Sequence, residues 1–124
     1  MNINGNLISS TEKPFIIAEL SANHNGSIQH ALKTIKAAKT SGVDAVKIQT
    51  YTPDTMTINN SSADFILKEG PWKNRSLYDL YSEAYTPYAW HKEIFNYARK
   101  IGVTIFSSPF DESAVDLLKS LNAP

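Results

Sequence analysis

Cysteine is absent from this 124-residue chain, and its absence excludes three kinds of site. There is no disulfide framework, no thiolate nucleophile and no thiolate-bound metal, which agrees with a reducing compartment. An excess of charge is absent too, because twelve Lys and Arg residues balance twelve Asp and Glu residues. Binders of nucleic acid and of anionic membranes carry a basic surface, so we expect neither partner here.

Long apolar runs are also absent. The longest ones extend over a few residues, whereas a helix that crosses a bilayer needs about 20. The opening stretch MNINGNLISSTEKP lacks the charged-then-apolar layout of a secretory signal, and we therefore expect a cytoplasmic protein. The hydrophobic content of 42% is sufficient for a core, so one modest globular domain that handles a small metabolite fits this composition.

The hydrophobic pattern predicts alternating strands and helices. An aliphatic run at residues 15–18 is typical of a strand buried on both faces, and a period of two predicts a second strand at residues 43–50. Between them, apolar residues at three-to-four spacing predict a helix from Ser27 to Gly42. A βαβ unit of about 35 residues demands a parallel sheet with a right-handed crossover.

The same rhythm resumes after an interruption. Residues 51–85 form a long polar insertion with one short helix expected near Ser76 to Ala84, and such connections are often functional lids. Thr86 and Pro87 are predicted to cap and begin the next helix, which Gly102 ends. A third strand, its polar exit loop and a last helix complete the α/β pattern at residues 103–107, 108–111 and 112–121.

Polar side chains stand at the end of each predicted strand, where a buried strand is otherwise apolar. In parallel α/β folds the carboxyl ends of the strands share one edge, and ligands bind there because rigid strands hold variable loops. We therefore expect a ligand site at this edge. The residues concerned are Glu19 with Asn23 and His24, Lys47 with Gln49, and Ser107 and Ser108 with Asp111.

Glu19 and Lys47 have the clearest chemical use at such an edge. A carboxylate that ends a strand is well placed for proton transfer or for orienting a neighbour. An inward-pointing lysine needs a counter-charge, and the phosphate or carboxylate of a substrate would supply it. The alternative interpretation is that Glu19 and Lys47 form only a buried ion pair between adjacent strands.

The asparagines and histidines also have plain structural interpretations. Asn23 and Asn25 have the composition of turn formers that accept left-handed backbone geometry beside Gly26. No two of the three histidines have the spacing of metal ligands, so we expect no metal site built wholly from this chain. These histidines are His24, His30 and His91.

Four segments carry a family resemblance. In order, they are FIIAELSANHNGS, AAKTSGVDAVKIQTYTPDTMT, LYDLYSEAYTPYAWHKEIFNYARKIG and FSSPFDESAVDLLKSLNAP. Together they resemble the N-terminal third of the sialic-acid synthase family, whose members condense phosphoenolpyruvate with an N-acetylated hexose to make a nine-carbon acid. Within the family they look most like the pseudaminic acid branch. The N-acetylneuraminate branch tends to differ at Ser21, Ala22 and Ser108.

The resemblance implies a fold and a set of partners. The fold is a (β/α)8 TIM barrel, of which this chain would hold about three βα units. A small antifreeze-like domain would follow and complete the active site of the partner subunit in a homodimer. The implied cofactor is a divalent metal, Mn or Mg, whose histidine ligands lie outside this chain.

The resemblance also implies roles for individual residues. The glutamate that matches Glu19 works at the reacting aldehyde carbon, and the lysine that matches Lys47 binds the phosphoenolpyruvate anion. Gln49 matches a polar neighbour in that pocket, and Ser108 falls where a hydroxyl contacts the phosphate. Asn23 and Asp111, in the loops beyond two of the strands, are further candidates for substrate binding.

Domain limits and product follow as expectations. Residues 1–14 are a lead-in, compatible with a small hairpin about Asn4 and Gly5, and residues 15–124 are a partial barrel that stops before a fourth strand and is inactive alone.

The expected acceptor is a hexose of the 2,4-diacetamido-2,4,6-trideoxy-altrose type, and the expected product is pseudaminic acid. The alternatives are an N-acetylneuraminate or legionaminate synthase, a barrel that makes seven- or eight-carbon sugar acids, and an inactive remnant or interaction module.

Overall fold

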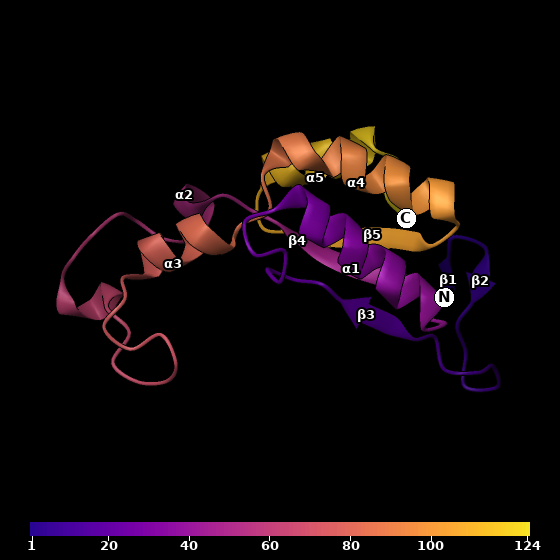
Figure 1. The fold of residues 1–124 in the computed structure, drawn as a ribbon, viewed down its shortest axis with the longest axis horizontal. Coiled ribbons are helices and arrows are strands. Elements are labelled where there is room, and N and C mark those ends of the chain that lie inside the picture. The colour runs from indigo at the N-terminus through magenta and orange to yellow at the C-terminus, as the bar shows by residue number, and fades with distance from the viewer.

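Three parallel strands form the centre of the fold. The structure is a computed structural model that describes all 124 residues. Its sheet has the order β3 (Ile17–Glu19), β4 (Ala45–Thr50), β5 (Thr104–Pro109), with both neighbouring pairs parallel. This arrangement confirms the predicted α/β class. Three helices pack on the sheet (Figure 1): α1 (Ile28–Thr40), α4 (Tyr88–Ile101) and α5 (Glu112–Ser120).

The register of the strands sorts their side chains onto two faces. Glu19 is paired with Lys47 and Lys47 with Phe106, while Gln49 is paired with Ser108. Paired residues of parallel strands point to the same side, so these residues share one face. The opposite face packs on the helices, in a core that includes Ile35, Val46, Ile48, Ile94, Phe95 and Ile105.

Strand β3 departs from its prediction. The sequence predicts a strand over residues 15–18 that is buried on both faces, whereas the observed strand begins at Ile17 and includes Glu19. Ile16 and Ile17 are 52% and 41% exposed. Burial on both faces is therefore wrong for β3, because it is an edge strand and the helices pack on one face of the sheet.

A short hairpin occupies the first residues of the chain. Strands β1 (Asn2–Ile3) and β2 (Asn6–Leu7) pair antiparallel around Asn4 and Gly5, which have φ angles of 48° and 87°. The Asn4 amide donates a hydrogen bond of 3.2 Å to Oγ1 of Thr104, the first residue of β5. The hairpin therefore lies at the amino-terminal edge of the sheet, opposite to the edge where the strands end.

The first residues of α1 and α4 show one predicted helix cap that is confirmed and one that is wrong. The Ser27 hydroxyl accepts a hydrogen bond from the N–H of His30 and caps α1, as predicted. The sequence also predicts Thr86 as the cap of α4, which is wrong. Pro87 occupies the cap position, and the Thr86 hydroxyl is buried without a hydrogen-bond partner. No helix combines the length and the apolar content needed to cross a membrane.

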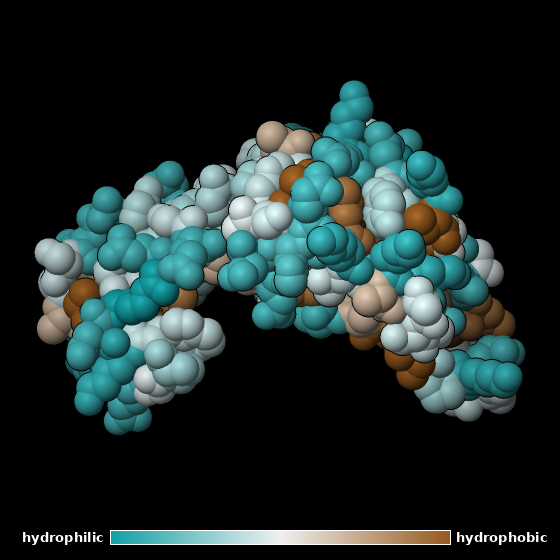
Figure 2. Space-filling model, viewed as in Figure 1, coloured by the Kyte–Doolittle hydropathy of each residue, from teal (hydrophilic) through white to brown (hydrophobic).

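Residues 51–85 form an arm that projects from the sheet (Figure 1). The arm contains α2 (Pro53–Met56), the 3-10 helix η1 (Ala63–Phe65) and α3 (Leu77–Ala84). The helix predicted in this insertion is confirmed as α3, whereas α2 and η1 are single turns, too short to show an apolar period. Figure 2 shows the arm as a mainly hydrophilic lobe, with a hollow between it and the rest of the molecule.

A chain of hydroxyl and imidazole groups, buried at Thr50 and His91, joins β4 and β5 to α4. Oγ1 of Thr50 lies 2.6 Å from Oγ of Ser107 and 2.8 Å from Nε2 of His91. Nδ1 of His91 lies 3.1 Å from the carbonyl oxygen of Pro87. A carbonyl only accepts, so His91 carries its proton on Nδ1 and accepts at Nε2 from Thr50. Burial lowers the pKa of His91, which favours this neutral ring.

We expect His91 to make folding sensitive to mild acid. Its folded-state pKa lies below the unfolded value of about 6.5, so at lower pH the unfolded chain binds a proton that the folded ring resists. The free energy of unfolding should therefore fall as the pH drops below about 6.5 and through the folded pKa. Urea unfolding at about pH 7.5 and about pH 5 measures this loss.

A pair of variants isolates the contribution of this side chain. His91→Gln should lose less stability between the two pH values than the parent does. His30→Gln, on the exposed face of α1, should lose as much as the parent. Equal losses in all three proteins would contradict the assignment to His91.

Candidate functional site

The carboxyl ends of the three strands bring three of the predicted site residues together. Nζ of Lys47 lies 2.5 Å from Oε2 of Glu19 and 3.5 Å from Oγ of Ser108. Glu19 and Lys47 are direct neighbours in the register of β3 and β4, and Ser108 belongs to β5. One ammonium group therefore lies between a carboxylate and a hydroxyl on the face of the sheet opposite to the helices, the polar face. We call Glu19, Lys47 and Ser108 the Lys47 cluster.

The pair formed by Glu19 and Lys47 is partly open to solvent. The side chains of Lys47 and Glu19 are 29% and 41% exposed. The ion pair of the alternative interpretation is therefore present, but it is not buried. A pair of this exposure contributes about 0–1 kcal/mol to stability, so the fold itself gains little from charges at this edge. Oε1 of Glu19 also accepts the Ser21 N–H at 3.1 Å, which orients the carboxylate.

Gln49 lies beside the Lys47 cluster but makes no hydrogen bond to it. It follows Lys47 by two positions on β4 and is paired in register with Ser108, so all three residues share a face. No hydrogen bond joins the Gln49 amide to another group of the chain. Because the Gln49 amide makes no hydrogen bond within the chain, its two N–H donors and its carbonyl acceptor are free to bind a ligand on this face.

Asp111 occupies a different place from the Lys47 cluster. Its Oδ1 accepts from the N–H of Ala114 at 2.8 Å and from the hydroxyl of Ser113 at 2.5 Å, which makes it the cap of α5. Its Oδ2 accepts from the hydroxyl of Tyr88 at 3.1 Å. The Ser113 bond is the main cause that lowers the pKa of Asp111. Both oxygens thus have partners within the chain, and substrate binding by Asp111 stays a prediction.

Asn23 also stands apart from the Lys47 cluster. Its amide nitrogen donates to the carbonyl oxygen of Leu20 at 3.0 Å, in the loop that follows β3. No hydrogen bond joins it to Glu19, Lys47 or Ser108. The structure instead places Asn23 on the wall of a cavity beside this loop.

His24 joins the loop after β3 to the arm, a role that the sequence analysis missed. The residue is 1% exposed. Its Nδ1 accepts from the N–H of Gly26 at 3.1 Å, and its Nε2 donates to the carbonyl oxygen of Ala84 at 3.1 Å. The ring of Trp90 lies edge-on to the imidazole, with 5.4 Å between the centroids. Because Ala84 is far away in the chain, no local pattern indicates this contact.

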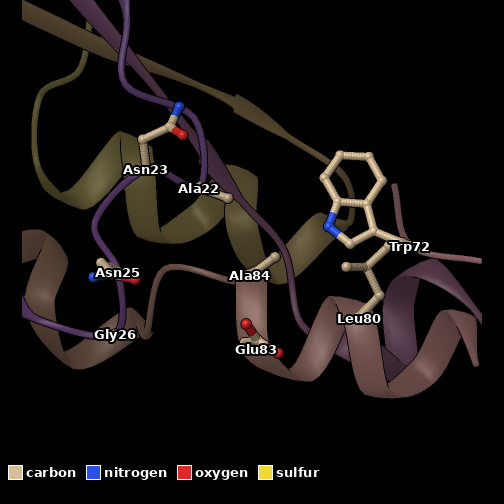
Figure 3. Close-up of a pocket in the computed structure, with 8 residues that line it drawn as sticks. All are labelled: Ala22, Asn23, Asn25, Gly26, Trp72, Leu80, Glu83 and Ala84. Carbon is tan, nitrogen blue, oxygen red and sulfur yellow. The ribbon is translucent and has the colours of Figure 1, made fainter. Parts of the chain in front are cut away.

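The cavity beside His24 has a volume of about 320 Å³ and lies between the loop after β3 and helix α3 (Figure 3). Loop residues form one side and arm residues the other. The lining residues are Ala22, Asn23, Asn25, Gly26, Trp72, Leu80, Glu83 and Ala84.

The residues of this chain do not fit a divalent metal by themselves. No group of three or more His, Asp or Glu side chains converges on a position that would hold a metal ion. The Lys47 cluster offers one carboxylate beside an ammonium group, which would oppose a second cation. The metal implied by the resemblance is therefore not assigned to residues of this chain.

Comparison with known proteins gives a consistent family match. The model of the NeuB family matches residues 34–124. Pseudaminic acid synthase of Campylobacter jejuni is 57% identical over 111 residues, which are 90% of this chain and 32% of that protein. Pseudaminic acid synthase of Helicobacter pylori is 50% identical over 113 residues, which are 91% of this chain and 33% of that protein.

A solved structure supports the same fold. The N-acetylneuraminic acid (sialic acid) synthetase of Leptospira borgpetersenii, crystallised with citrate, is similar with a TM-score of 0.70 and 26% identity. The match covers 88% of this chain and 33% of that one. The chain thus spans about a third of the length of the relatives that it matches.

The capping role of Asp111 leads to a prediction. Asp111→Ala should lower the free energy of unfolding by about 1 kcal/mol, because the N–H of Ala114 loses its acceptor. Asp111→Asn should stay close to the parent, since asparagine caps helices about as well as aspartate. Urea unfolding of the three proteins measures both effects. Parental stability of Asp111→Ala would contradict the capping role.

Proposed function

The chain belongs to the NeuB family, which confirms its resemblance to the sialic-acid synthases, and on this premise we propose that Glu19, Lys47 and Ser108 act in joining phosphoenolpyruvate to an N-acetylated hexose. The observation that carries the proposal is the position of the Lys47 ammonium, between a carboxylate and a hydroxyl at the edge where the strands end. The names of the Campylobacter and Helicobacter relatives support pseudaminic acid as the product.

The reaction sets clear requirements for its site. A carbon–carbon bond forms between C3 of phosphoenolpyruvate and the aldehyde carbon of the hexose, and the aldehyde oxygen gains a proton. Water adds to C2 of the phosphoenolpyruvate part and loses a proton, and phosphate leaves from that carbon, so that a 2-keto acid results. The site therefore needs cationic groups for the phosphate and carboxylate, and a group that moves protons.

Lys47 meets the first requirement. An ammonium group has three donors, and the Glu19 carboxylate and the Ser108 hydroxyl use two of them here. The third donor and the partly exposed charge are available to an anion on the same face. We assign the phosphoenolpyruvate anion to Lys47 and its phosphate to the Ser108 hydroxyl, with Gln49 as a neutral donor beside them.

Glu19 meets the second requirement. Its carboxylate is oriented by the Ser21 N–H and is partly exposed on the polar face, so a substrate can reach it. We assign proton transfer at the reacting aldehyde carbon to this residue. The divalent metal and the homodimer implied by the family are proposals for the full-length protein, in which other residues would hold the metal.

A direct assay tests the proposed function. The full-length protein is supplied with phosphoenolpyruvate and one of two aldehydes, a 2,4-diacetamido-2,4,6-trideoxy-altrose or N-acetylmannosamine, and phosphate release is measured. We expect release with the diacetamido sugar, together with a nine-carbon product in the mass spectrum. Turnover of N-acetylmannosamine alone would favour an N-acetylneuraminate synthase.

Replacing Lys47 tests its binding role. Lys47→Ala should raise the KM for phosphoenolpyruvate about tenfold or more, because hydrogen bonds from a charged donor are worth about 1.5–3 kcal/mol. Its free energy of unfolding should change by less than about 1 kcal/mol, as for other exposed pairs. Lys36→Ala, on the exposed face of α1, is the control. An unchanged KM would refute anion binding by Lys47, and loss of the folded state would indicate a structural ion pair.

Replacing Glu19 separates chemistry from binding. Glu19→Gln keeps an acceptor for the Ser21 N–H but cannot serve as a base, so kcat should fall about a hundredfold or more. The KM for phosphoenolpyruvate should stay the same or fall, because Lys47 loses a competing anion. Steady-state kinetics of this variant and of Glu93→Gln, on the exposed face of α4, give the comparison. Weaker phosphoenolpyruvate binding with a parental kcat would make Glu19 a structural residue.

A further inference from the structure

We propose that the cavity between the loop after β3 and helix α3 is a second ligand site, which binds an acetamido group of the hexose. This proposal rests on the proposed function, since it names the part of the acceptor sugar that the cavity would hold.

The two walls of the cavity are fastened to each other. His24 is buried and accepts from the N–H of Gly26 on the loop wall, while it donates to the carbonyl oxygen of Ala84 on the arm wall. Both of these partners line the cavity. The opening is therefore held by two hydrogen bonds from one buried ring, and its volume of about 320 Å³ is within the range of small-molecule sites.

One part of the lining is apolar. Trp72 and Leu80 lie together on the arm, and Figure 3 shows Ala22 and Ala84 between them and the two asparagines. Trp72 is 52% exposed, and burying a large aromatic ring would release favourable free energy that this exposure leaves unused. A methyl group placed between Trp72 and Leu80 would cover part of this surface.

The other part of the lining offers amide groups. The nitrogen of the Asn23 amide already donates to the Leu20 carbonyl, so its oxygen remains an acceptor, and Figure 3 shows this oxygen turned toward the side on which Trp72 lies. The Asn25 amide has no hydrogen bond within the chain and can donate. An acetamido group has one N–H, one carbonyl and one methyl, which match the Asn23 oxygen, the free Asn25 amide and the Trp72 surface.

The lining offers no cationic group for the other substrate. None of the lining residues is Lys, Arg or His, and the one charged group is the carboxylate of Glu83. Glu83 is itself paired with Arg75 at 2.6 Å. Phosphoenolpyruvate carries a phosphate and a carboxylate and would find no cationic partner in this lining, whereas Lys47 attracts it. An uncharged group of the sugar is therefore the matching ligand.

The loop wall of the cavity follows the proposed catalytic carboxylate directly in the chain. Ala22 and Asn23 belong to the loop that leaves β3 directly after Glu19, and the Ser21 N–H donates to the Glu19 carboxylate at 3.1 Å. The same short loop therefore orients the Glu19 carboxylate through Ser21 and supplies Ala22 and Asn23 to the cavity.

Two variants of the full-length protein test the proposal, each with a matched control. Ala22→Leu fills the cavity, and Ala89→Leu makes the same change on the exposed face of α4. Asn25→Gly removes the amide without strain because Asn25 has a φ of 52°, a conformation that glycine adopts freely. Asn122→Gly makes the same change at a φ of 51°, away from the cavity.

Kinetics with the two aldehydes give the first readout. Ala22→Leu and Asn25→Gly should lower kcat/KM for the hexose about tenfold or more, with the KM for phosphoenolpyruvate unchanged and both controls at the parental values. An effect on both sugars assigns the cavity to the acetamido group that they share. An effect on the diacetamido sugar alone assigns it to the second group. Parental hexose kinetics in both variants would overturn the proposal, as would an equal rise in the KM for phosphoenolpyruvate.

Ligand-observed NMR separates this proposal from the proposed function. Saturation transfer to the acetamido methyl protons of the diacetamido hexose is measured with the parent and with Ala22→Leu. Transfer in the parent that is lost in the variant supports the cavity, even where neither sugar gives phosphate release. Transfer that is absent from the parent, or equal in both proteins, overturns it.

Discussion

The parallel register of β3, β4 and β5 is the constraint on which the rest of the structure depends. A shift of β4 by one residue would turn Ile48 toward the polar face and Lys47 toward the helices, because side chains alternate with a period of two. The burial of Val46 and Ile48 against the helices opposes such a shift. The apolar core thus determines which side chains meet at the strand ends, although none of its members takes part in the proposed chemistry.

The two faces of β5 are linked by the same alternation. Ser107 points toward the helices, where it meets Thr50 and the buried His91, and Ser108 points the other way, toward Lys47. The buried hydrogen bonds therefore hold the backbone that presents Ser108. Burying polar groups costs free energy of folding unless each of them has a hydrogen-bond partner. Thr50, Ser107 and His91 each have one here.

Much of the sheet could be predicted from the sequence, because its signals are local. The alternation in residues 43–50 and the spacing of apolar residues after Ser27 predict β4 and α1, and the strand ends predict that Glu19, Lys47 and Ser108 meet. The failures concern contacts between distant segments. The exposure of β3, the joint made by His24 and the cavity all depend on which segments become neighbours in space. The capping role of Asp111 is different, since aspartate directly before a helix is a local signal that predicts a cap and was not used.

The attachment of the arm has a consequence for how such proteins diversify. Trp72 and Leu80 belong to a segment that contributes no strand to the sheet and no residue to the main core cluster. Mutations there change the far wall of the cavity and leave the register of β3, β4 and β5 intact. Selection can therefore act on ligand preference in the arm while the inherited scaffold and its charged edge stay fixed, provided that His24 continues to fasten the two parts.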